Sequence, residues 1–401
     1  MRATDRSKKK LIWIDFLVLD IFLHKTAIIE ITKNLTERGY TIYLFAMYSK
    51  RKYKFKNSKI HIIQIPLRYI PIISPILFTG SLLLILPFYI MYINPDFIVT
   101  GPGLSFLGFI WTPILSRLRH VKNVLDIRST PVYPEGIRGY LRVLAFNISV
   151  LYAKSFFNGI TIITAPMKRE ICKKFLIDPG FIGVWTSGVS EDLFDPNKFI
   201  SEAAELREKM GLADKFIIFH HGNLAFKRGI VECIKSIKII KNKYIDIVLF
   251  LLGTVTSQEI VKTIRREGVQ DRVIIHGPVE YQEVPKYIAM SDVGIVPIPD
   301  LPEWRHQCPL KLLEYLSMNK AFIVTDILGH REIIGDRSID RSCCIYISSA
   351  EPKEIAKAMI FAFKNREKLK QFGSYGRSII HNRYTWKTVA EGLDGYLSAL
   401  N

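Results

Sequence analysis

The amino-acid sequence predicts an α/β fold of two domains, each built around a parallel sheet. The chain has 401 residues, which is more than one hydrophobic core usually serves. Residues 11–46 predict a strand, a helix and a strand, and residues 291–336 predict a strand, a loop, a helix and a strand. This alternation indicates parallel strands, because a parallel connection needs a crossover segment, usually a helix.

The charge of the chain indicates an anionic partner. Lysine and arginine number 56 against 37 aspartates and glutamates, so the formal net charge is +19. Nucleic acid, anionic lipid and the diphosphate of a sugar nucleotide all fit this charge, and charge alone does not choose among them. No nucleic-acid recognition motif occurs in the sequence, so we expect no nucleic-acid partner. With 49% hydrophobic and 23% charged residues, the chain is expected to be globular.

The cysteines favour a reduced, cytoplasmic protein. There are five of them, an odd number, and none is spaced as C-x-x-C. The pattern indicates neither a disulfide framework nor a structural zinc site. The basic residues near the start precede a strand-like run without a small-residue cleavage site, so no signal peptide is predicted.

Two neighbouring segments favour contact with a membrane. Residues 69–94 contain no charged side chain and are long enough to cross a bilayer, but three prolines interrupt them. We expect a loop and a helix that packs on the sheet and touches lipid with part of its surface; a membrane span is the alternative. Residues 49–59 carry six basic residues, which suits an anionic lipid surface or simply a solvated loop. We expect the same basic surface to be extended by four further residues: Arg117, Arg119, Lys122 and Arg128.

The remaining elements continue the alternation. The helix at residues 25–38 has Ile28, Ile31 and Leu35 on one face and ends at Gly39. Further strands are predicted at residues 121–127, 159–165, 215–221, 245–252 and 272–276, and further helices at residues 167–175, 257–267, 283–290, 351–365 and 366–381. A charged, linker-like segment at residues 195–214 marks the predicted domain junction.

Residues 291–336 carry the strongest pattern for a ligand site. A strand at residues 293–297 precedes a polar loop, and a helix opens at Pro309, where the missing N–H costs nothing. Lys311 and Glu314 follow, one helical turn apart. Ligands in parallel sheets bind at the carboxyl ends of strands, where this loop and helix start lie. The plainer interpretation of Lys311 and Glu314 is an exposed ion pair.

This stretch resembles the nucleotide-sugar site of GT-B glycosyltransferases, specifically the retaining family-4 type. Such enzymes have a strand that ends in proline, a P-x-K-x-x-E-Y helix start and a T-D-x-x-G-x-x-E turn. Here these parts are Pro297, the sequence PLKLLEY at residues 309–315, and residues 325–332. Many members carry a second glutamate eight residues before the position of Glu314, where this chain has His306.

Other segments resemble the same family. Residues 222–229 (GNLAFKRG) place Lys227 and Arg228 before a glycine at a helix start, an arrangement that suits a diphosphate. Residues 253–254 resemble the strand-end glycine near the nucleotide, and residues 275–279 (IHGPV) resemble the backbone that holds the base. Residues 185–189 (WTSGV) resemble the turn that closes the first domain.

The resemblance implies a GT-B fold: two Rossmann-like domains with a cleft between them and a C-terminal helix that crosses back. It implies a membrane-facing acceptor domain at residues 1–194, a nucleotide-sugar domain at residues 195–381 and the crossing helix at residues 382–401.

Site roles follow from the same resemblance. Catalysis falls to Arg228, Lys311 and Glu314, because cations stabilise a leaving diphosphate and the carboxylate accepts hydrogen bonds from ribose hydroxyls. Donor contacts fall to Gly222, Asn223, Lys227, Gly253, Thr254, Gly277, Val279, His306, Pro309, Leu310, Gly329 and His330. Asp126 and Arg128, at a strand end, are expected to contact the acceptor, with a salt-bridged loop as the alternative.

The implied activity is transfer of a hexose from a UDP- or GDP-linked donor to a lipid-linked or glycan acceptor, with retention and without a metal ion or cofactor. The product would serve surface polysaccharide, glycolipid or glycoprotein glycan assembly at the inner face of the cell membrane, with the enzyme held peripherally. Two other classes stay open. One is a sugar-nucleotide 2-epimerase of the same fold; the other is a non-catalytic glycan- or lipid-binding subunit, which Glu314 and Arg228 disfavour.

Overall fold

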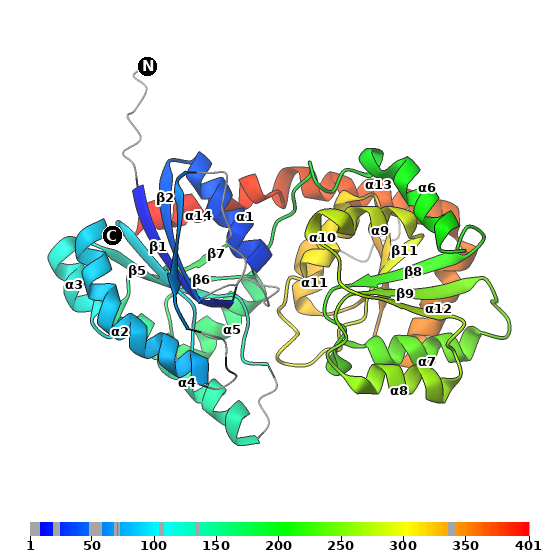
Figure 1. Ribbon diagram of the computed structural model, residues 1–401, viewed down its shortest axis with the longest axis horizontal. Helices are drawn as coiled ribbons and strands as arrows, with labels where there is room; N and C mark the ends of the chain where they lie inside the picture. Colours follow the sequence, from blue (N-terminus) through cyan, green and yellow to red (C-terminus); the bar gives the residue numbers. More distant parts are fainter. Residues whose placement is uncertain are drawn as a thin grey trace, which may run out of the picture. The chain divides into compact units, whose positions relative to one another are not determined.

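The chain forms two compact units, each with one parallel sheet and helices on its faces (Figure 1). The computed structural model describes residues 9–18, 25–47, 58–67, 70, 73–103, 108–132, 136–335 and 342–400. Unit 1 is Met1–Thr186 with Trp386–Asn401, and unit 2 is Ser187–Thr385. The first division lies within the turn predicted at residues 185–189, and the charged segment from residue 195 belongs to unit 2. The α/β class is confirmed, with Rossmann-like units as predicted.

Unit 1 contains a seven-stranded sheet in the order β3-β2-β1-β4-β5-β6-β7, with every neighbouring pair parallel. The strands are β1 (Lys9–Val18), β2 (Tyr40–Met47), β3 (Ile60–Ile65), β4 (Phe97–Thr100), β5 (Lys122–Ile127), β6 (Gly159–Ile162) and β7 (Ile182–Val184). The helices are α1 (Lys25–Glu37), α2 (Ile73–Ile93), α3 (Thr112–Arg119), α4 (Gly136–Phe156), α5 (Ala165–Phe175) and α14 (Trp386–Ala399). The strand order reverses beside β1, so helices cover both faces of the sheet. Helices α1 and α14 lie on one face of the sheet, and helices α2, α3 and α4 lie on the other face (Figure 1).

Helix α2 accounts for the uncharged segment and packs on the sheet as predicted. Its buried residues include Phe78, Leu82, Leu86 and Ile90, which recur every fourth residue along one face. The ring of Phe78 meets Phe16 of β1 edge-on at 5.5 Å between centroids. Within the described residues, α2 has the length and composition to cross a membrane, yet this stripe ties it to the sheet. Residues 49–57 of the predicted basic segment lie outside the described residues.

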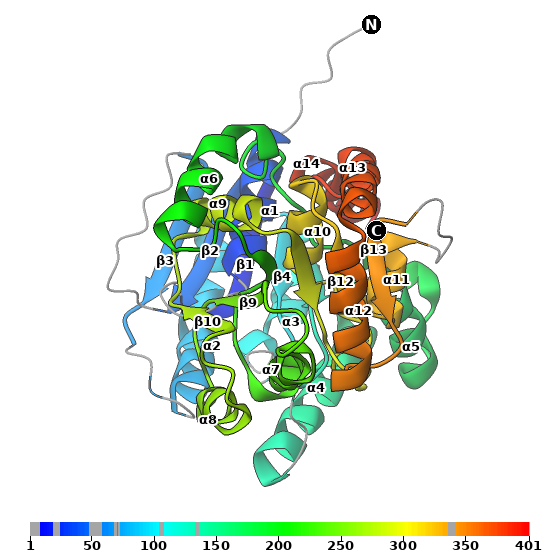
Figure 2. The same ribbon diagram turned by 90° about the vertical axis from the view of Figure 1, so that its right-hand side faces the viewer.

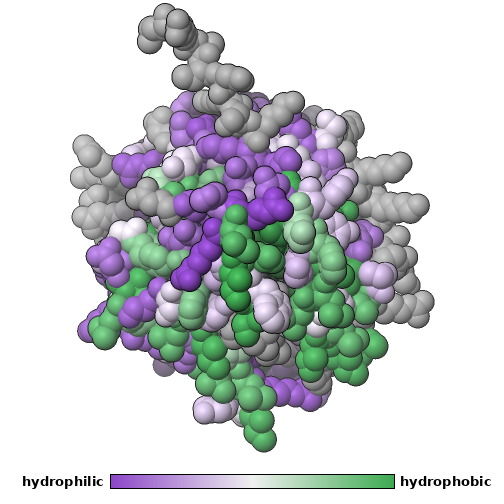
Figure 3. Space-filling model, turned by 90° about the vertical axis from the view of Figure 1, so that its left-hand side faces the viewer, coloured by the Kyte–Doolittle hydropathy of each residue, from purple (hydrophilic) through white to green (hydrophobic). Residues whose placement is uncertain are grey.

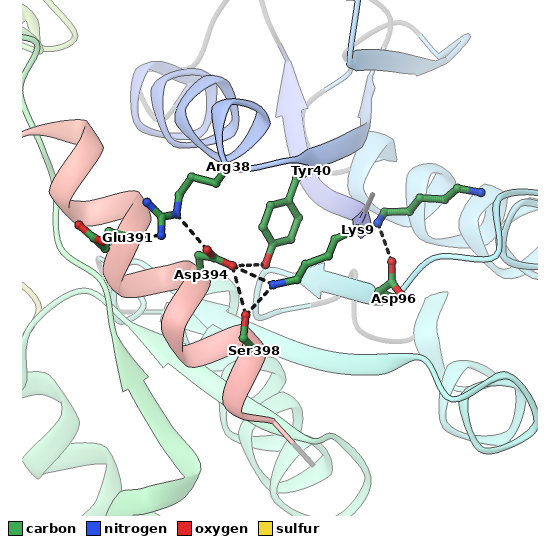
Figure 4. Close-up of polar contacts among 8 residues, drawn as sticks. Lys9, Arg38, Tyr40, Asp96, Glu391, Asp394 and Ser398 are labelled. Atoms are coloured by element: carbon green, nitrogen blue, oxygen red, sulfur yellow. Dashed lines mark hydrogen bonds and ion pairs between the residues drawn. The ribbon is translucent and has the colours of Figure 1, made fainter. Parts of the chain in front are cut away.

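The carboxylate of Asp394 in helix α14 bonds to several side chains of unit 1 (Figure 4). Asp394 accepts hydrogen bonds from Lys9 Nζ at 3.1 Å, Tyr40 Oη at 2.8 Å and Arg38 Nε at 2.9 Å. Although burial acts in the opposite direction, the hydrogen bonds from Tyr40, Arg38 and Lys9 lower the pKa of Asp394 to about 2. The C-terminal helix is therefore a part of the first unit.

Unit 2 contains a six-stranded sheet in the order β10-β9-β8-β11-β12-β13, with every neighbouring pair parallel. The strands are β8 (Phe216–His221), β9 (Ile247–Leu252), β10 (Val273–His276), β11 (Val293–Val296), β12 (Phe322–Thr325) and β13 (Cys344–Ile347). The α-helices are α6 (Ile200–Lys209), α7 (Ile230–Ile240), α8 (Gln258–Glu267), α9 (Val284–Met290), α10 (Leu310–Ser317), α11 (Leu328–Ile334), α12 (Pro352–Lys364) and α13 (Arg366–Arg383).

The centre of this sheet is buried on both faces. All residues of β8 and β9 are buried, as expected of parallel strands covered by helices on each side. Helices α7 and α12 pack side by side and share one core cluster with these strands (Figure 2). Functional side chains can therefore reach a ligand only at the strand ends.

Candidate functional site

The candidate site lies within unit 2, where the strand order reverses between β8 and β11. Ligands in open parallel sheets bind outside the carboxyl ends of the strands at such a reversal. Gly222 directly follows β8, Pro297 directly follows β11, and α10 starts after the loop that leaves β11. The predicted donor residues are collected at this end of one sheet.

Lys311, in the first turn of α10, points at the end of β8. Its Nζ lies 3.0 Å from Nε2 of His220, and Nδ1 of His220 lies 2.8 Å from the carbonyl oxygen of Ile295 in β11. A carbonyl only accepts, so Nδ1 of His220 carries the proton and Nε2 accepts from Lys311. Burial and the charge of Lys311 lower the pKa of His220 well below 6.5, which keeps the imidazole neutral.

Glu314, one turn further along α10, is held in the same way. It accepts a hydrogen bond from Tyr281 Oη at 2.9 Å, and its second oxygen lies 3.2 Å from Nε2 of His221. Glu314 is 2% exposed and Lys311 is 9% exposed. Two consecutive histidines at the end of β8 thus each approach one charged group of α10. The exposed ion pair, the plainer interpretation of the sequence, is wrong, because both side chains are buried.

Burial brings the pKa values of Lys311 and Glu314 close to 7. Burial, reinforced by Arg228 and opposed by Glu314, lowers the pKa of Lys311 to about 7. Burial, opposed by the hydrogen bond from Tyr281 and the charge of Lys311, raises the pKa of Glu314 to about 7. A ligand that brings an anion to Lys311 and hydroxyl groups to Glu314 would restore the charged form of both.

Arg228 supplies a second cation beside Lys311. It lies in the turn Phe226–Arg228 before α7, and its guanidinium carbon is 4.8 Å from the ring centroid of buried Trp304. Stacking on an indole holds a guanidinium in place while its edge remains able to bind an anion. Arg228 is near enough to Lys311 to lower its pKa. Asn223 and Lys227 lie in the same loop, both partly exposed.

Two glycines let three strand ends meet closely. A Cβ on Gly229, whose φ is +77°, would lie 1.9 Å from the carbonyl oxygen of Pro297. A Cβ on Gly253, whose φ is +143°, would lie 1.8 Å from the carbonyl oxygen of Gly222. No side chain fits at either position, so the loops after β8, β9 and β11 are packed backbone to backbone.

The residues expected to hold a base lie at the end of β10. Gly277 is exposed and Val279 is half-buried, and Thr254, which follows the neighbouring strand β9, is exposed. Nδ1 of His276 lies 2.9 Å from the carbonyl oxygen of Gly277, and the N–H of Gly253 donates to the carbonyl oxygen of His276 at 2.9 Å. The segment is therefore held by backbone contacts next to the glycines of the neighbouring strand.

The loop after β11 and the start of α11 lie against one another. The N–H of Gly329 donates to the carbonyl oxygen of Arg305 at 2.8 Å, and a Cβ on Gly329 would lie 2.3 Å from the carbonyl oxygen of Gln307. His306 in this loop is buried, and Pro309 and Leu310 are half-buried at the start of α10. His330 is fully buried, its Nδ1 lies 2.8 Å from the carbonyl oxygen of Thr325, and burial lowers its pKa to about 4.

The two residues expected to meet the acceptor lie in unit 1, around Trp185. Asp126 is buried and accepts hydrogen bonds from Thr161 Oγ1 and Trp185 Nε1, each at 2.8 Å. Arg128 donates to the carbonyl oxygen of Trp185 at 2.6 Å, and its guanidinium lies 3.5 Å from the ring centroid. Burial raises the pKa of Asp126 to about 6, and burial also raises the pKa of Asp15, within β1, to about 6.

Several residues around the candidate site received no specific role from the sequence. His220 and His221 end an apolar strand, and from this position the sequence predicts that one of them faces the site; in the structure each of them approaches a charged group of α10. Tyr281 and Trp304 gave no such signal, because their partners lie far away in the sequence. Asp15 lies within β1, the strand beside which unit 1 reverses its strand order, and could have been found from that position.

No metal centre is evident in the described part of the chain. Groups of three or more His, Cys, Asp or Glu side chains that could hold a metal ion do not occur among those residues.

The two units share the fold of the GT-B class, which the sequence resembles. Residues 202–379 match the family model described as glycosyl transferases group 1. That segment contains every residue placed above in the site of unit 2, from His220 to His330.

Parts of the chain are similar to known proteins. The chain is 24% identical over 149 residues to alpha-D-kanosaminyltransferase of Streptomyces kanamyceticus, covering 37% of each chain. It is 27% identical over 177 residues to TuaH of Bacillus subtilis strain 168, which is assigned to teichuronic acid biosynthesis as a glycosyltransferase, covering 42% of this chain and 41% of the relative. These matches thus span less than half the length of the relatives.

The fold is shared over nearly the whole chain with a solved structure. HepE of Anabaena, crystallised in complex with UDP and glucose, matches with a TM-score of 0.74 at 14% identity, covering 98% of this chain and 100% of that chain. At this identity the likeness establishes the fold.

Proposed function

We propose that this protein is a glycosyltransferase that moves a hexose from a UDP- or GDP-linked donor to a lipid-linked or glycan acceptor. The observation that carries the proposal is the buried pair Lys311 and Glu314, which two histidines and Tyr281 orient at the reversal point of the unit 2 sheet. A buried cation and a buried carboxylate are costly without a ligand to satisfy them. A nucleoside diphosphate supplies both an anion and ribose hydroxyls.

In the proposed reaction, the bond between the anomeric carbon and the diphosphate oxygen breaks. Negative charge grows on the leaving diphosphate, and Arg228 with Lys311 stabilises it; Lys227 lies in the same loop as a further cation. Glu314 accepts hydrogen bonds from the ribose hydroxyls. The backbone at Gly222, Gly253 and Gly277 leaves room for the nucleotide, and the segment around Gly329 and His330 covers the diphosphate or sugar. The acceptor hydroxyl attacks from the front face, with the leaving phosphate as base, so the configuration is retained.

The acceptor side of the proposal rests on unit 1. Asp126 and Arg128 would contact the acceptor sugar or its phosphate, and we infer a place for the enzyme on the inner face of the cell membrane. TuaH, one of the relatives, is assigned to the biosynthesis of a polysaccharide, which suits a role in surface glycan assembly. The reaction as proposed requires neither a metal ion nor a cofactor.

A transfer assay tests the proposal. The protein is incubated with radiolabelled UDP- or GDP-sugars and a membrane extract that supplies lipid-linked acceptors, and labelled lipid or glycan is counted. We expect label transfer by wild type, loss of transfer in Lys311→Met, and no loss in the exposed control Lys370→Met. An isomerised nucleotide sugar without acceptor would instead indicate the 2-epimerase. Nucleotide binding without any turnover would indicate the binding subunit; both outcomes contradict the proposal.

A further inference from the structure

Helix α4 of unit 1 is apolar on two opposite faces. Phe146, Val150 and Ala153 face the sheet and are buried. With 3.6 residues per turn, the opposite face carries side chains that are between 40% and 82% exposed. These are Ile137, Tyr140, Leu141, Leu144, Ile148 and Leu151. A soluble surface helix would carry polar residues here, so this face is built to contact something apolar.

The neighbouring helices α2 and α3 continue the exposed apolar surface. In α2, Leu84 and Phe88 are each 73% exposed and Tyr92 is 87% exposed. Before and within α3, Trp111 is 52% exposed and Leu118 is 73% exposed. Figure 3 shows apolar side chains gathered over the lower part of this side of the molecule, below a hydrophilic zone.

Contacts between the three helices make the surface continuous. Helices α2 and α3 touch. Tyr152 of α4 donates a hydrogen bond to the carbonyl oxygen of Ile110, just before α3, at 3.2 Å. A Cβ on Gly108 would lie 2.8 Å from Cβ of Leu82 in α2, so the chain before α3 lies directly against α2. We call this surface the α2–α3–α4 face.

The charges on the α2–α3–α4 face are all positive. Arg117 and Arg119 lie in α3, Arg138, Arg142 and Lys154 lie in α4, and all five are exposed. None of the three helices contains aspartate or glutamate. In α4 the arginines flank one edge of the apolar stripe and Lys154 flanks the other. A second copy of the chain docked on this face would bring like charges together, whereas an anionic lipid surface complements them.

We propose that the α2–α3–α4 face inserts its apolar side chains into the headgroup region of an anionic bilayer, while its arginines and Lys154 bind lipid phosphates. The pattern of apolar and aromatic residues edged by cations is that of interfacial helices. Helix α2 lies along the membrane, because crossing it would strip the buried stripe of Phe78, Leu82 and Leu86 from the sheet. This inference deepens the membrane location in the proposed function and is independent of the donor site in unit 2.

Trp111 offers a direct reporter of insertion. Of the five tryptophans, Trp13, Trp185, Trp304 and Trp386 are at most 3% exposed, whereas Trp111 is 52% exposed. Vesicles of phosphatidylcholine mixed with phosphatidylglycerol, with and without bromine on the acyl chains, should therefore quench one tryptophan only. We expect quenching by the brominated vesicles and its loss in Trp111→Phe. Absence of quenching in wild type would overturn the insertion.

Sedimentation with the same vesicles tests both components of the surface. Leu84→Ser with Phe88→Ser should weaken partitioning at least about tenfold, and Arg138→Gln with Arg142→Gln about thirtyfold. Matched controls in unit 2, the exposed Ile239→Ser with Ile245→Ser and Lys357→Gln with Lys370→Gln, should change nothing. Equal losses in the controls would overturn the proposal. The proposal would also be overturned if wild type formed a dimer and Phe88→Ser dissociated this dimer without changing vesicle binding. Titration of each variant with UDP- and GDP-sugars shows whether the donor site is intact. A failure of the membrane proposal can therefore be distinguished from a failure of the proposed activity.

Discussion

Nε2 of His220 accepts a hydrogen bond from Nζ of Lys311 at 3.0 Å, and the other nitrogen of the same ring is fixed by the carbonyl oxygen of Ile295. The imidazole is thus a fixed acceptor that aims the ammonium of α10 at the end of β8. His220 is a positioning residue on this account, because it acts through Lys311 and not on the substrate.

Replacing His220 should weaken diphosphate binding without unfolding unit 2. His220→Leu removes the acceptor, and a lost hydrogen bond to a buried charged group costs about 1.5–3 kcal/mol. Calorimetry with UDP or GDP should show a Kd raised about 10- to 100-fold. His220→Gln restores an acceptor oxygen and should recover part of the affinity. Equal affinity in wild type and His220→Leu would remove the positioning role.

Donor binding should change its proton stoichiometry in sign across neutral pH. Lys311, with a pKa of about 7, is mostly neutral at pH 8, and a bound diphosphate raises this pKa, so binding takes up a proton. Glu314, also with a pKa of about 7, is mostly protonated at pH 6, and ribose hydroxyls favour its carboxylate, so binding releases a proton. Calorimetry of a nucleotide sugar in buffers of different ionisation enthalpy measures both.

Glu314→Gln is the control for that sign change. In this variant, the release of a proton on binding at pH 6 should disappear and the uptake of a proton at pH 8 should remain, if enough binding remains to measure. Binding that exchanges no protons at either pH would contradict the arrangement of charges described for α10.

Gly229 should tolerate no side chain. The Cβ of alanine would lie 1.9 Å from the carbonyl oxygen of Pro297, and the strand ends that form the site would have to separate. We expect Gly229→Ala to cost about 3 kcal/mol or more in the free energy of unfolding. Gly211 is a matched control, since its φ is +68° and nothing lies within 4 Å of its Cβ position. Gly211→Ala should cost only about 1 kcal/mol. If urea unfolding showed similar losses in the free energy of unfolding for the two variants, the close approach of Gly229 to Pro297 would be contradicted.

Asp394 should stabilise unit 1 in a pH-dependent way. Its pKa in the folded protein, about 2, lies below the ordinary 3.8, so the stabilisation is complete above pH 3.8 and disappears as the pH falls toward 2. Allowing for partial solvent screening, Asp394→Asn should cost about 1–2 kcal/mol at pH 7. The exposed Glu391→Gln, whose carboxylate lies 3.7 Å from Arg38, should cost less than about 0.5 kcal/mol. Thermal unfolding should show a smaller difference in Tm between wild type and Asp394→Asn at pH 3 than at pH 7. An equal difference at both pH values would exclude the charge of Asp394 as the cause of the stabilisation.

The sequence predicted the elements whose signals are local. The strand–helix–strand units at residues 11–46 and 291–336 were predicted correctly because apolar runs and helical spacing are visible within one segment. The helix predicted at residues 257–267 is found for the same reason, and the hydroxyl of Ser257 accepts a hydrogen bond from the N–H of Glu259 at its start. Helix α4 was not predicted, because its two apolar faces give only a weak amphipathic pattern.

The candidate site was only partly predictable. Lys311, Glu314 and Arg228 were predicted by their resemblance to a family, and the structure brings them together. Their burial could not be predicted, since it depends on strands that are distant in the sequence. The same holds for Tyr281, which lies 33 residues from Glu314. It follows β10, whereas Glu314 follows β11, and two other strands lie between β10 and β11 in the sheet.

The central claim is that Glu314 and its neighbours form a nucleotide-sugar site. The most direct test is a calorimetric titration of wild type, Glu314→Gln and the exposed control Glu367→Gln with UDP, GDP and their sugars. We expect one nucleotide to bind wild type and the control equally and to bind Glu314→Gln at least about tenfold more weakly. Binding that is unchanged by Glu314→Gln, or no binding of any nucleotide to wild type, would contradict the account.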